Sequence, residues 1–132
     1  MKKFLLSIVT FLIAAISYAQ VSALDSDPKA SESSTVIVGN ARFTILTPKL
    51  LRMEWSEDGK FEDLATLTFI NRKLPVPGFK VSTNGKTVTI KTSDLTLTYV
   101  DEGIPFDASN LKVEFLTARE KSIWTPGLDD SG

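Results

Sequence analysis

Residues 42–77 decide the fold of this chain, and they read RFTILTPKLLRMEWSEDGKFEDLATLTFINRKLPVP. Apolar and polar residues alternate on both sides of Pro48, and the alternation returns at Leu67 and Phe69 after an acidic turn at Asp58-Gly59. A period of two places each apolar set on one face of a β-strand. The stretch therefore predicts paired β-strands around the acidic turn.

The same alternation continues along the chain, without a convincing helical stripe in any window. Enrichment in threonine, valine, isoleucine and phenylalanine also favours strands. Because each strand has one apolar face to bury, about eight short antiparallel strands predict an all-β, antiparallel β-sandwich. The apolar members of the predicted strands are Val36 and Val38; Phe43 and Ile45; Leu51, Met53 and Trp55; Leu67 and Phe69; Val88 and Ile90; Leu95, Leu97 and Tyr99; and Leu111, Val113 and Phe115.

Turn residues agree with this pattern. Asn84-Gly85 separates FKVST from KTVTI, and Asn-Gly predicts a type I′ hairpin because both central residues need positive φ. Ser93-Asp94 predicts another turn, and Pro75 with its neighbours predicts a loop or an edge before Phe79.

The first residues have the pattern of a signal peptide. Lys2 and Lys3 precede an apolar run over 4–16, and small residues up to Ala19 predict cleavage before Gln20. The alternative is a membrane anchor, but the run is short for a span of about 20 residues. We therefore expect export, to the periplasm or the extracellular space, of a mature protein without a membrane segment.

Residues 1–19 are thus predicted to be a signal peptide, 20–34 a disordered linker and 35–132 a β-sandwich domain. The linker is rich in serine, aspartate and alanine. After the predicted strand over 111–116 the chain ends soon beyond Trp124, so we expect the sandwich to be partial, with an uncovered edge. A partial sandwich is expected to be marginally stable by itself.

Composition excludes several classes of function. The 132 residues carry 15 basic and 16 acidic side chains, for a formal net charge of −1, and no basic stripe suits nucleic acid. The chain has no cysteine and no histidine, so a disulfide, a thiol nucleophile, a histidine-based triad and an ordinary zinc site are not expected. We expect no cofactor and no metal.

No residue of this chain is predicted to be catalytic. Paired carboxylates can catalyse the hydrolysis of a glycosidic bond. A retaining mechanism of this kind needs two carboxylates about 5–5.5 Å apart across one sugar. Neighbouring residues on an extended backbone point in opposite directions, and the acidic pairs lie in predicted turns, where solvated carboxylates are the better interpretation. The same holds for Asp25 and Asp27, since calcium needs six or more oxygens. The acidic pairs are Glu57-Asp58, Glu62-Asp63, Asp101-Glu102 and Asp129-Asp130.

Trp124 is the one candidate ligand-contacting residue. It precedes Pro126-Gly127, outside the regular alternation, so core packing and stacking on a substrate sugar are both open. Trp55 shares a predicted face with Met53 and is expected in the core. Phe61 is expected to clasp the sandwich.

Several separated pieces of the chain resemble a known family. They are RFTILTPKLLRMEWS, then FED with TLTFINRKLPVP, then DLTLTY, then WTPGLDD, between about Val38 and Asp130. In this order and spacing they resemble the N-terminal β-sandwich of glycoside hydrolase family 31, the retaining α-glucosidases and α-xylosidases. WTPGLDD is similar to a W-x-P-G-x-x-D run that leads, in that family, to Asn-Leu-Gly-Gly-Thr.

The resemblance implies a galactose-mutarotase-like sandwich that precedes a catalytic (β/α)8 barrel with two catalytic aspartates. No residue of this sequence matches those barrel motifs. The implied function is therefore the non-catalytic N-terminal part of an exported α-glycosidase, whose partners are its own barrel and, through the whole enzyme, an α-linked oligosaccharide. The alternative is a free-standing secreted module that binds carbohydrate or protein.

Overall fold

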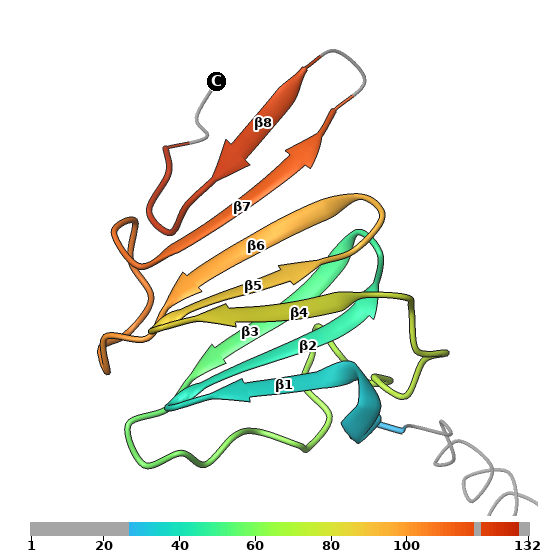
Figure 1. Ribbon diagram of the computed structural model, residues 1–132. Helices are drawn as coiled ribbons and strands as arrows, with labels where there is room; N and C mark the ends of the chain where they lie inside the picture. Colours follow the sequence, from blue (N-terminus) through green and yellow to red (C-terminus); the bar gives the residue numbers. More distant parts are fainter. Residues whose placement is uncertain (1–26, 118–119, 130–132) are drawn as a thin grey trace, which may run out of the picture.

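The computed structural model describes residues 27–117 and 120–129, which form an all-β structure of two antiparallel sheets (Figure 1). One short 3-10 helix precedes the first strand. The elements are η1 (Glu32–Ser34), β1 (Thr35–Val38), β2 (Ala41–Thr47), β3 (Leu50–Trp55), β4 (Lys80–Asn84), β5 (Thr87–Lys91), β6 (Leu95–Val100), β7 (Leu111–Leu116) and β8 (Lys121–Trp124).

Both sheets are meanders, in which each strand pairs with the next along the chain. Strands β1-β2-β3 form the first sheet, and β4-β5-β6-β7-β8 form the second. The segment from 56 to 79 connects the two sheets (Figure 1). Because the first sheet is narrower than the second among the described residues, the two cannot cover each other completely.

The hydrophobic core lies between the two sheets, as in a β-sandwich. Phe43 of β2 contacts Tyr99 of β6 with ring centroids 5.3 Å apart, and Phe106 completes the aromatic group at 5.7 Å from Phe43 and 5.5 Å from Tyr99. Apolar residues at alternate positions of both sheets fill this layer, which confirms the predicted period of two. The buried core residues are Ala41, Phe43, Ile45, Val88, Ile90, Leu95, Leu97, Tyr99, Leu111 and Val113.

One predicted strand, at Leu67 and Phe69, is wrong. The segment from 56 to 79 contains no strand, and a local turn forms where Thr66 N–H donates to Phe69 O at 3.1 Å and Phe69 N–H donates to Thr66 Oγ1. A strand exists only where a second strand accepts its backbone bonds. No other strand in the described part of the chain pairs with this segment, and Leu67 is fully exposed.

The predicted hairpin between β4 and β5 is confirmed, but its predicted turn type is wrong. Asn84 pairs with Thr87, which makes Gly85 and Lys86 the two loop residues. Gly85 has φ +60° and no non-glycine described residue has positive φ, as in a type II′ turn with glycine at its first central position. The predicted turns at Asp58-Gly59 and Ser93-Asp94 are present.

The structure describes only residues 27–34 of the predicted linker, and these contact the domain. The carbonyl of Asp27 accepts bonds from the backbone N–H groups of Arg72 and Lys73, at 2.8 and 3.2 Å. Ser34 is buried at the start of β1. The predicted signal peptide, residues 1–19, lies outside the described residues. Among the residues that were placed, no helix is long and apolar enough to cross a membrane.

Candidate functional site

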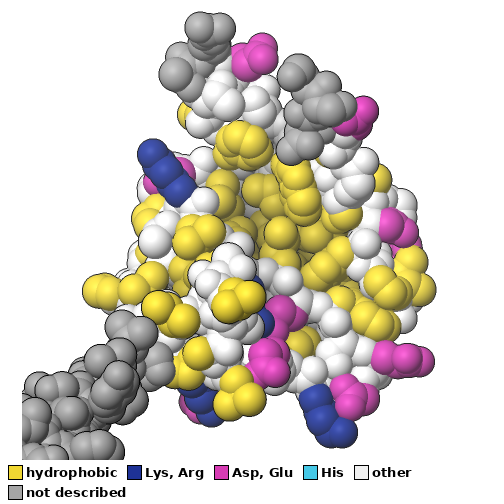
Figure 2. Space-filling model, turned by 180° about the vertical axis from the view of Figure 1, so that it is seen from behind, with side chains coloured by type: hydrophobic (Ala, Val, Ile, Leu, Met, Phe, Trp, Pro, Cys, Tyr) yellow, Lys and Arg dark blue, Asp and Glu magenta, His cyan; other side chains and the backbone are white. Residues whose placement is uncertain are grey.

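An apolar groove of about 400 Å³ lies beside β3, where the wider sheet extends beyond the narrower one. Figure 2 shows apolar side chains gathered in a hollow on this face of the molecule. Strand β3 forms one wall, and β7 and β8 form the other. The lining residues are Lys49, Leu50, Leu51, Met53, Ser93, Asp94, Leu95, Val113, Phe115, Leu116 and Trp124.

Strand register places the apolar side chains in this groove. Met53 is paired with the buried Phe43, so both side chains lie on the inner face of their sheet. Trp124 is paired with the buried Val113, which puts the indole on the inner face of the other sheet. The groove is therefore the uncovered continuation of the core layer.

Several apolar residues that line the groove remain partly exposed to solvent. Leu51, Met53 and Phe115 pack against the buried core but are only half-buried themselves. Leu116 is 79% exposed and Leu50 is 43% exposed. A contiguous apolar surface of this kind is typical of an interaction site, because contact between apolar side chains and water is unfavourable.

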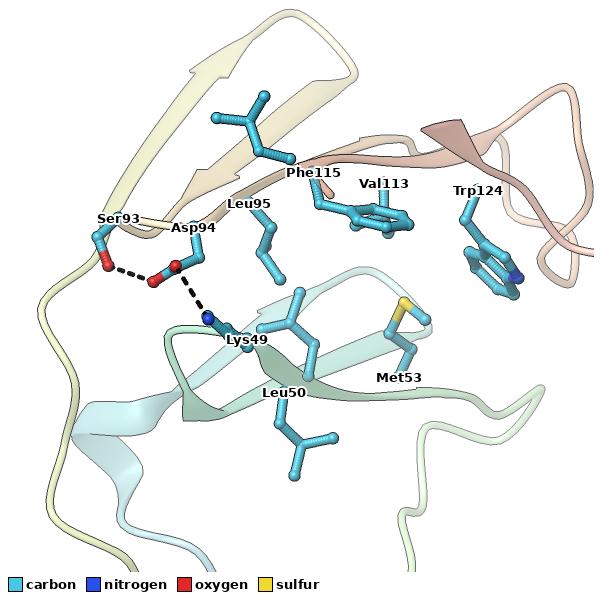
Figure 3. Close-up of a pocket in the computed structure, with 11 residues that line it drawn as sticks. Lys49, Leu50, Met53, Ser93, Asp94, Leu95, Val113, Phe115 and Trp124 are labelled. Atoms are coloured by element: carbon cyan, nitrogen blue, oxygen red, sulfur yellow. Dashed lines mark hydrogen bonds and ion pairs between the residues drawn. The ribbon is translucent and has the colours of Figure 1, made fainter. Parts of the chain in front are cut away.

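Polar groups of the groove gather at one end. The Lys49 ammonium is 3.7 Å from one Asp94 carboxylate oxygen, and the Ser93 hydroxyl donates a hydrogen bond to the other at 2.7 Å (Figure 3). Thr92 donates its hydroxyl to Pro48 O at 2.6 Å, which ties the two sheets together at this end. These polar groups satisfy one another, so the rest of the groove presents apolar surface.

Trp124 lies at the opposite end of the groove from this polar group (Figure 3). Its side chain is 37% exposed, and its neighbours along the groove include Met53 and Val113. A sugar platform needs hydroxyl partners beside the ring as well as the ring itself. The location of Trp124 suits contact with an apolar partner, and sugar contact at this residue stays a prediction.

Trp55, expected in the core, packs against it but is only half-buried, because β3 is the edge strand of its sheet among the described residues. Its indole N–H is buried and has no hydrogen-bond partner among the residues that the structure describes. Phe61, expected as a clasp, lies under the Arg42 guanidinium at 4.8 Å from the ring centroid. This cation–π contact fixes the segment that follows β3 against the outer face of the first sheet.

Of the acidic pairs predicted to lie in turns, Glu57-Asp58 does, whereas Glu62-Asp63 and Asp101-Glu102 lie in irregular segments. Asp63 forms an ion pair with Arg42. A hydrogen bond from Ser56 lowers the pKa of Asp58, and one from Arg42 lowers the pKa of Asp63. Glu62 accepts a bond from the backbone of Leu64. A general acid needs a raised pKa at neutral pH, and the pKa values of Asp58 and Asp63 are shifted in the opposite direction.

Within residues 27–117 and 120–129, no group of three or more carboxylate, histidine or cysteine side chains is arranged to hold a metal ion. Asp27 instead forms an ion pair with Lys73 at 3.1 Å. Asp25 and Asp130 lie outside the described residues.

The sequence did not predict a cluster of three arginines on the outer face of the first sheet, of which Arg42 and Arg72 are buried and Arg52 is half-buried. Arg42, Arg52 and Arg72 all donate to the carbonyl of Glu62, at 2.9, 3.1 and 2.7 Å. Arg72 is only 2% exposed and also donates to the Leu64 carbonyl. Three guanidiniums on one carbonyl hold the segment after β3 firmly against the sheet.

Carboxylates compensate most of the charge of this cluster. Arg42 donates to Glu54 at 2.8 Å and to Asp63 at 2.6 Å, and Arg52 lies 2.7 Å from Glu54. Burial lowers the pKa of Arg52, and repulsion by Arg72 and Arg42 adds to this lowering. A signal was present in the sequence, since Arg42, Arg52 and Glu54 occupy the polar positions of β2 and β3, but Arg72 comes from a loop.

Comparison with models of known protein families gave no match, and comparison with curated proteins also gave none.

Proposed function

We propose that this chain is the N-terminal, non-catalytic β-sandwich part of an exported retaining α-glycosidase of the family 31 type. In this proposal the sandwich is galactose-mutarotase-like and supports a (β/α)8 barrel in the same polypeptide. The barrel supplies the catalytic carboxylates and hydrolyses α-glucosides or α-xylosides, without a cofactor. The N-terminal segment directs the enzyme to the periplasm or the outside of the cell.

The observation that carries this proposal is the apolar groove between β3 and β7–β8. It is continuous with the core and lined by half-buried side chains such as Met53 and Phe115, as expected of a domain that packs against further protein. The described carboxylates support the non-catalytic part of the proposal. Hydrogen bonds donated by Ser56 and Arg42 lower the pKa values of Asp58 and Asp63, which suits structural carboxylates rather than a proton donor.

The test begins with the reading frame beyond the codon for Gly132. We expect it to continue through Asn-Leu-Gly-Gly-Thr into a barrel with two catalytic aspartates. The complete polypeptide is then purified and assayed on aryl α-glucosides and aryl α-xylosides, beside residues 20–132 alone. We expect the complete polypeptide to hydrolyse at least one of them and residues 20–132 to hydrolyse neither. Turnover by residues 20–132 that disappears when an acidic residue is replaced would refute the non-catalytic assignment.

The partial exposure of Trp124 at the mouth of the groove favours a second candidate, a free-standing secreted module that binds carbohydrate. Calorimetry of the chain with an α-linked oligosaccharide separates the two. Saturable binding that is lost in Trp124→Ala, in a protein whose reading frame stops at Gly132, would favour the module over the enzyme.

A further inference from the structure

A second pocket, of about 330 Å³, lies on the outer face of the β1-β2-β3 sheet. Its base consists of residues that pair across β1 and β2, Thr35 with Thr44 and Ile37 with Arg42. Side chains at these alternate positions share one face of the sheet, and the buried Phe43 lies on the other face. The segment before β1 and the segment after β3 form the walls, so this pocket is separate from the apolar groove and from the core.

Arg72 lines this pocket and is a buried cation that forms no ion pair with a described carboxylate. Both of its side-chain hydrogen bonds go to neutral groups, the backbone carbonyls of Glu62 and Leu64. The ion pairs of the arginine cluster join Arg42 and Arg52 to carboxylates and leave Arg72 out. A guanidinium has five N–H donors, so three of those of Arg72, the Nε–H among them, have no partner among the described residues. Burying a charge without a counter-ion is unfavourable, so Arg72 suits a bound anion.

The charges around the pocket also favour an anion. Its lining contains three cationic side chains, Lys29, Arg42 and Arg72, and two acidic ones, Glu32 and Asp63. Asp63 is already paired with Arg42 at 2.6 Å, and Lys29 is exposed. The hydrogen bond from Arg42 lowers the pKa of Asp63, and the positive charges of Lys29 and Arg72 add to this lowering. All three cations therefore make the electrostatic potential beside Asp63 more positive.

We propose that this pocket binds a small oxyanion, the carboxylate or phosphate group of a polar ligand. A guanidinium matches the paired oxygens of either group, and the two carbonyl bonds of Arg72 hold its guanidinium in place. The volume lies at the lower end of the range of about 300–1,000 Å³ for small-molecule sites, so the body of a small ligand fits beside its anionic group. Thr44 adds a hydroxyl group to the lining. Binding at this pocket does not depend on the proposed glycosidase activity.

Isothermal titration calorimetry of the exported protein at its natural length tests the proposal, at constant ionic strength because salt screens charges. The probes are inorganic phosphate, acetate and acetamide, the last being a neutral molecule with the shape of acetate. We expect saturable binding of phosphate, acetate or both with a Kd of about 10 mM or lower, and no binding of acetamide. Binding of only one anion identifies which group the ligand carries. If neither anion reaches half-saturation by about 10 mM, or if acetamide binds as tightly as acetate, the proposal is overturned.

A matched pair of charge reversals locates the anion. Lys29→Glu changes an exposed residue of the lining, whereas Lys86→Glu makes the same change in the turn between β4 and β5, outside the pocket. We expect Lys29→Glu to raise the Kd for the bound anion by at least about threefold, and Lys86→Glu to leave it unchanged. Equal effects of the two variants would show attraction by net charge alone and contradict binding in the pocket.

Arg72→Lys tests the guanidinium itself, because it keeps the positive charge and removes the paired donors. We expect this variant to bind the anion about tenfold or more weakly. Unchanged affinity in an Arg72→Lys protein that circular dichroism shows to be folded overturns the proposal, and if this variant does not fold, the Lys29→Glu and Lys86→Glu pair decides. Hydrolysis of aryl α-glycosides by the same preparations keeps the two proposals apart. Anion binding without hydrolysis supports the pocket and refutes the glycosidase, whereas hydrolysis without anion binding does the reverse.

Discussion

Replacing Phe43 with alanine tests whether one aromatic group joins the two sheets. Phe43 is fully buried and belongs to β2, whereas its partners Tyr99 and Phe106 belong to β6 and the loop after it. Phe43→Ala removes both ring contacts and leaves a cavity between the sheets. Phe61→Ala is the matched control, because Phe61 is half-buried and contacts Arg42 on the outer face.

The expected losses of stability differ because Phe43 lies in the core, whereas Phe61 lies on the outer face. Truncating a buried phenylalanine to alanine costs about 3–5 kcal/mol, and complete burial of Phe43 puts it toward the upper part of that range. A cation–π contact such as that of Phe61 is worth about 0.5–1 kcal/mol at a partly exposed site. In a domain of this size, 1 kcal/mol shifts the melting temperature by about 4–8 °C.

Thermal unfolding followed by circular dichroism measures the difference. We expect Phe43→Ala to lower the melting temperature by at least about 12 °C, or to abolish the cooperative transition, because a small domain has only about 5–15 kcal/mol of stability. Phe61→Ala is expected to lower it by about 8 °C or less. If the two variants melt within a few degrees of each other, the aromatic group does not join the sheets.

Three further predictions follow from single residues. The Arg42 hydrogen bond holds the pKa of Asp63 below its ordinary value of 3.8, so its contribution to stability is present above that pH and is lost as the pH falls through the lowered pKa; acid titration of unfolding should show a weaker dependence below about pH 4 in Asp63→Asn. Gly85 has φ +60°, so Gly85→Ala should destabilise the β4–β5 hairpin by about 1 kcal/mol or more, measured by urea unfolding, whereas Gly78→Ala, without positive φ or crowding, should not. Mass spectrometry of the exported protein should find Gln20, free or cyclised, as the first residue, and an intact Met1 would contradict the signal peptide.

The sequence by itself determined the local features of the fold. Alternation in stretches such as 95–99 requires only that neighbouring side chains point to opposite faces, so it predicted strands and their buried residues before any pairing was known. The glycine of Asn84-Gly85 likewise fixed the position of a hairpin, although only the register showed that Gly85 is its first loop residue and not its second.

Tertiary structure decided which of these local preferences were realised. Leu67 and Phe69 alternate as well as the strand residues do, yet their segment found no partner strand and was held instead by Arg72 and its bonds to backbone carbonyls. The groove beside Met53 has the same origin. It exists because three strands face five in the described part of the chain, and the number of strands that meet in each sheet depends on pairing between distant segments, which no local period encodes.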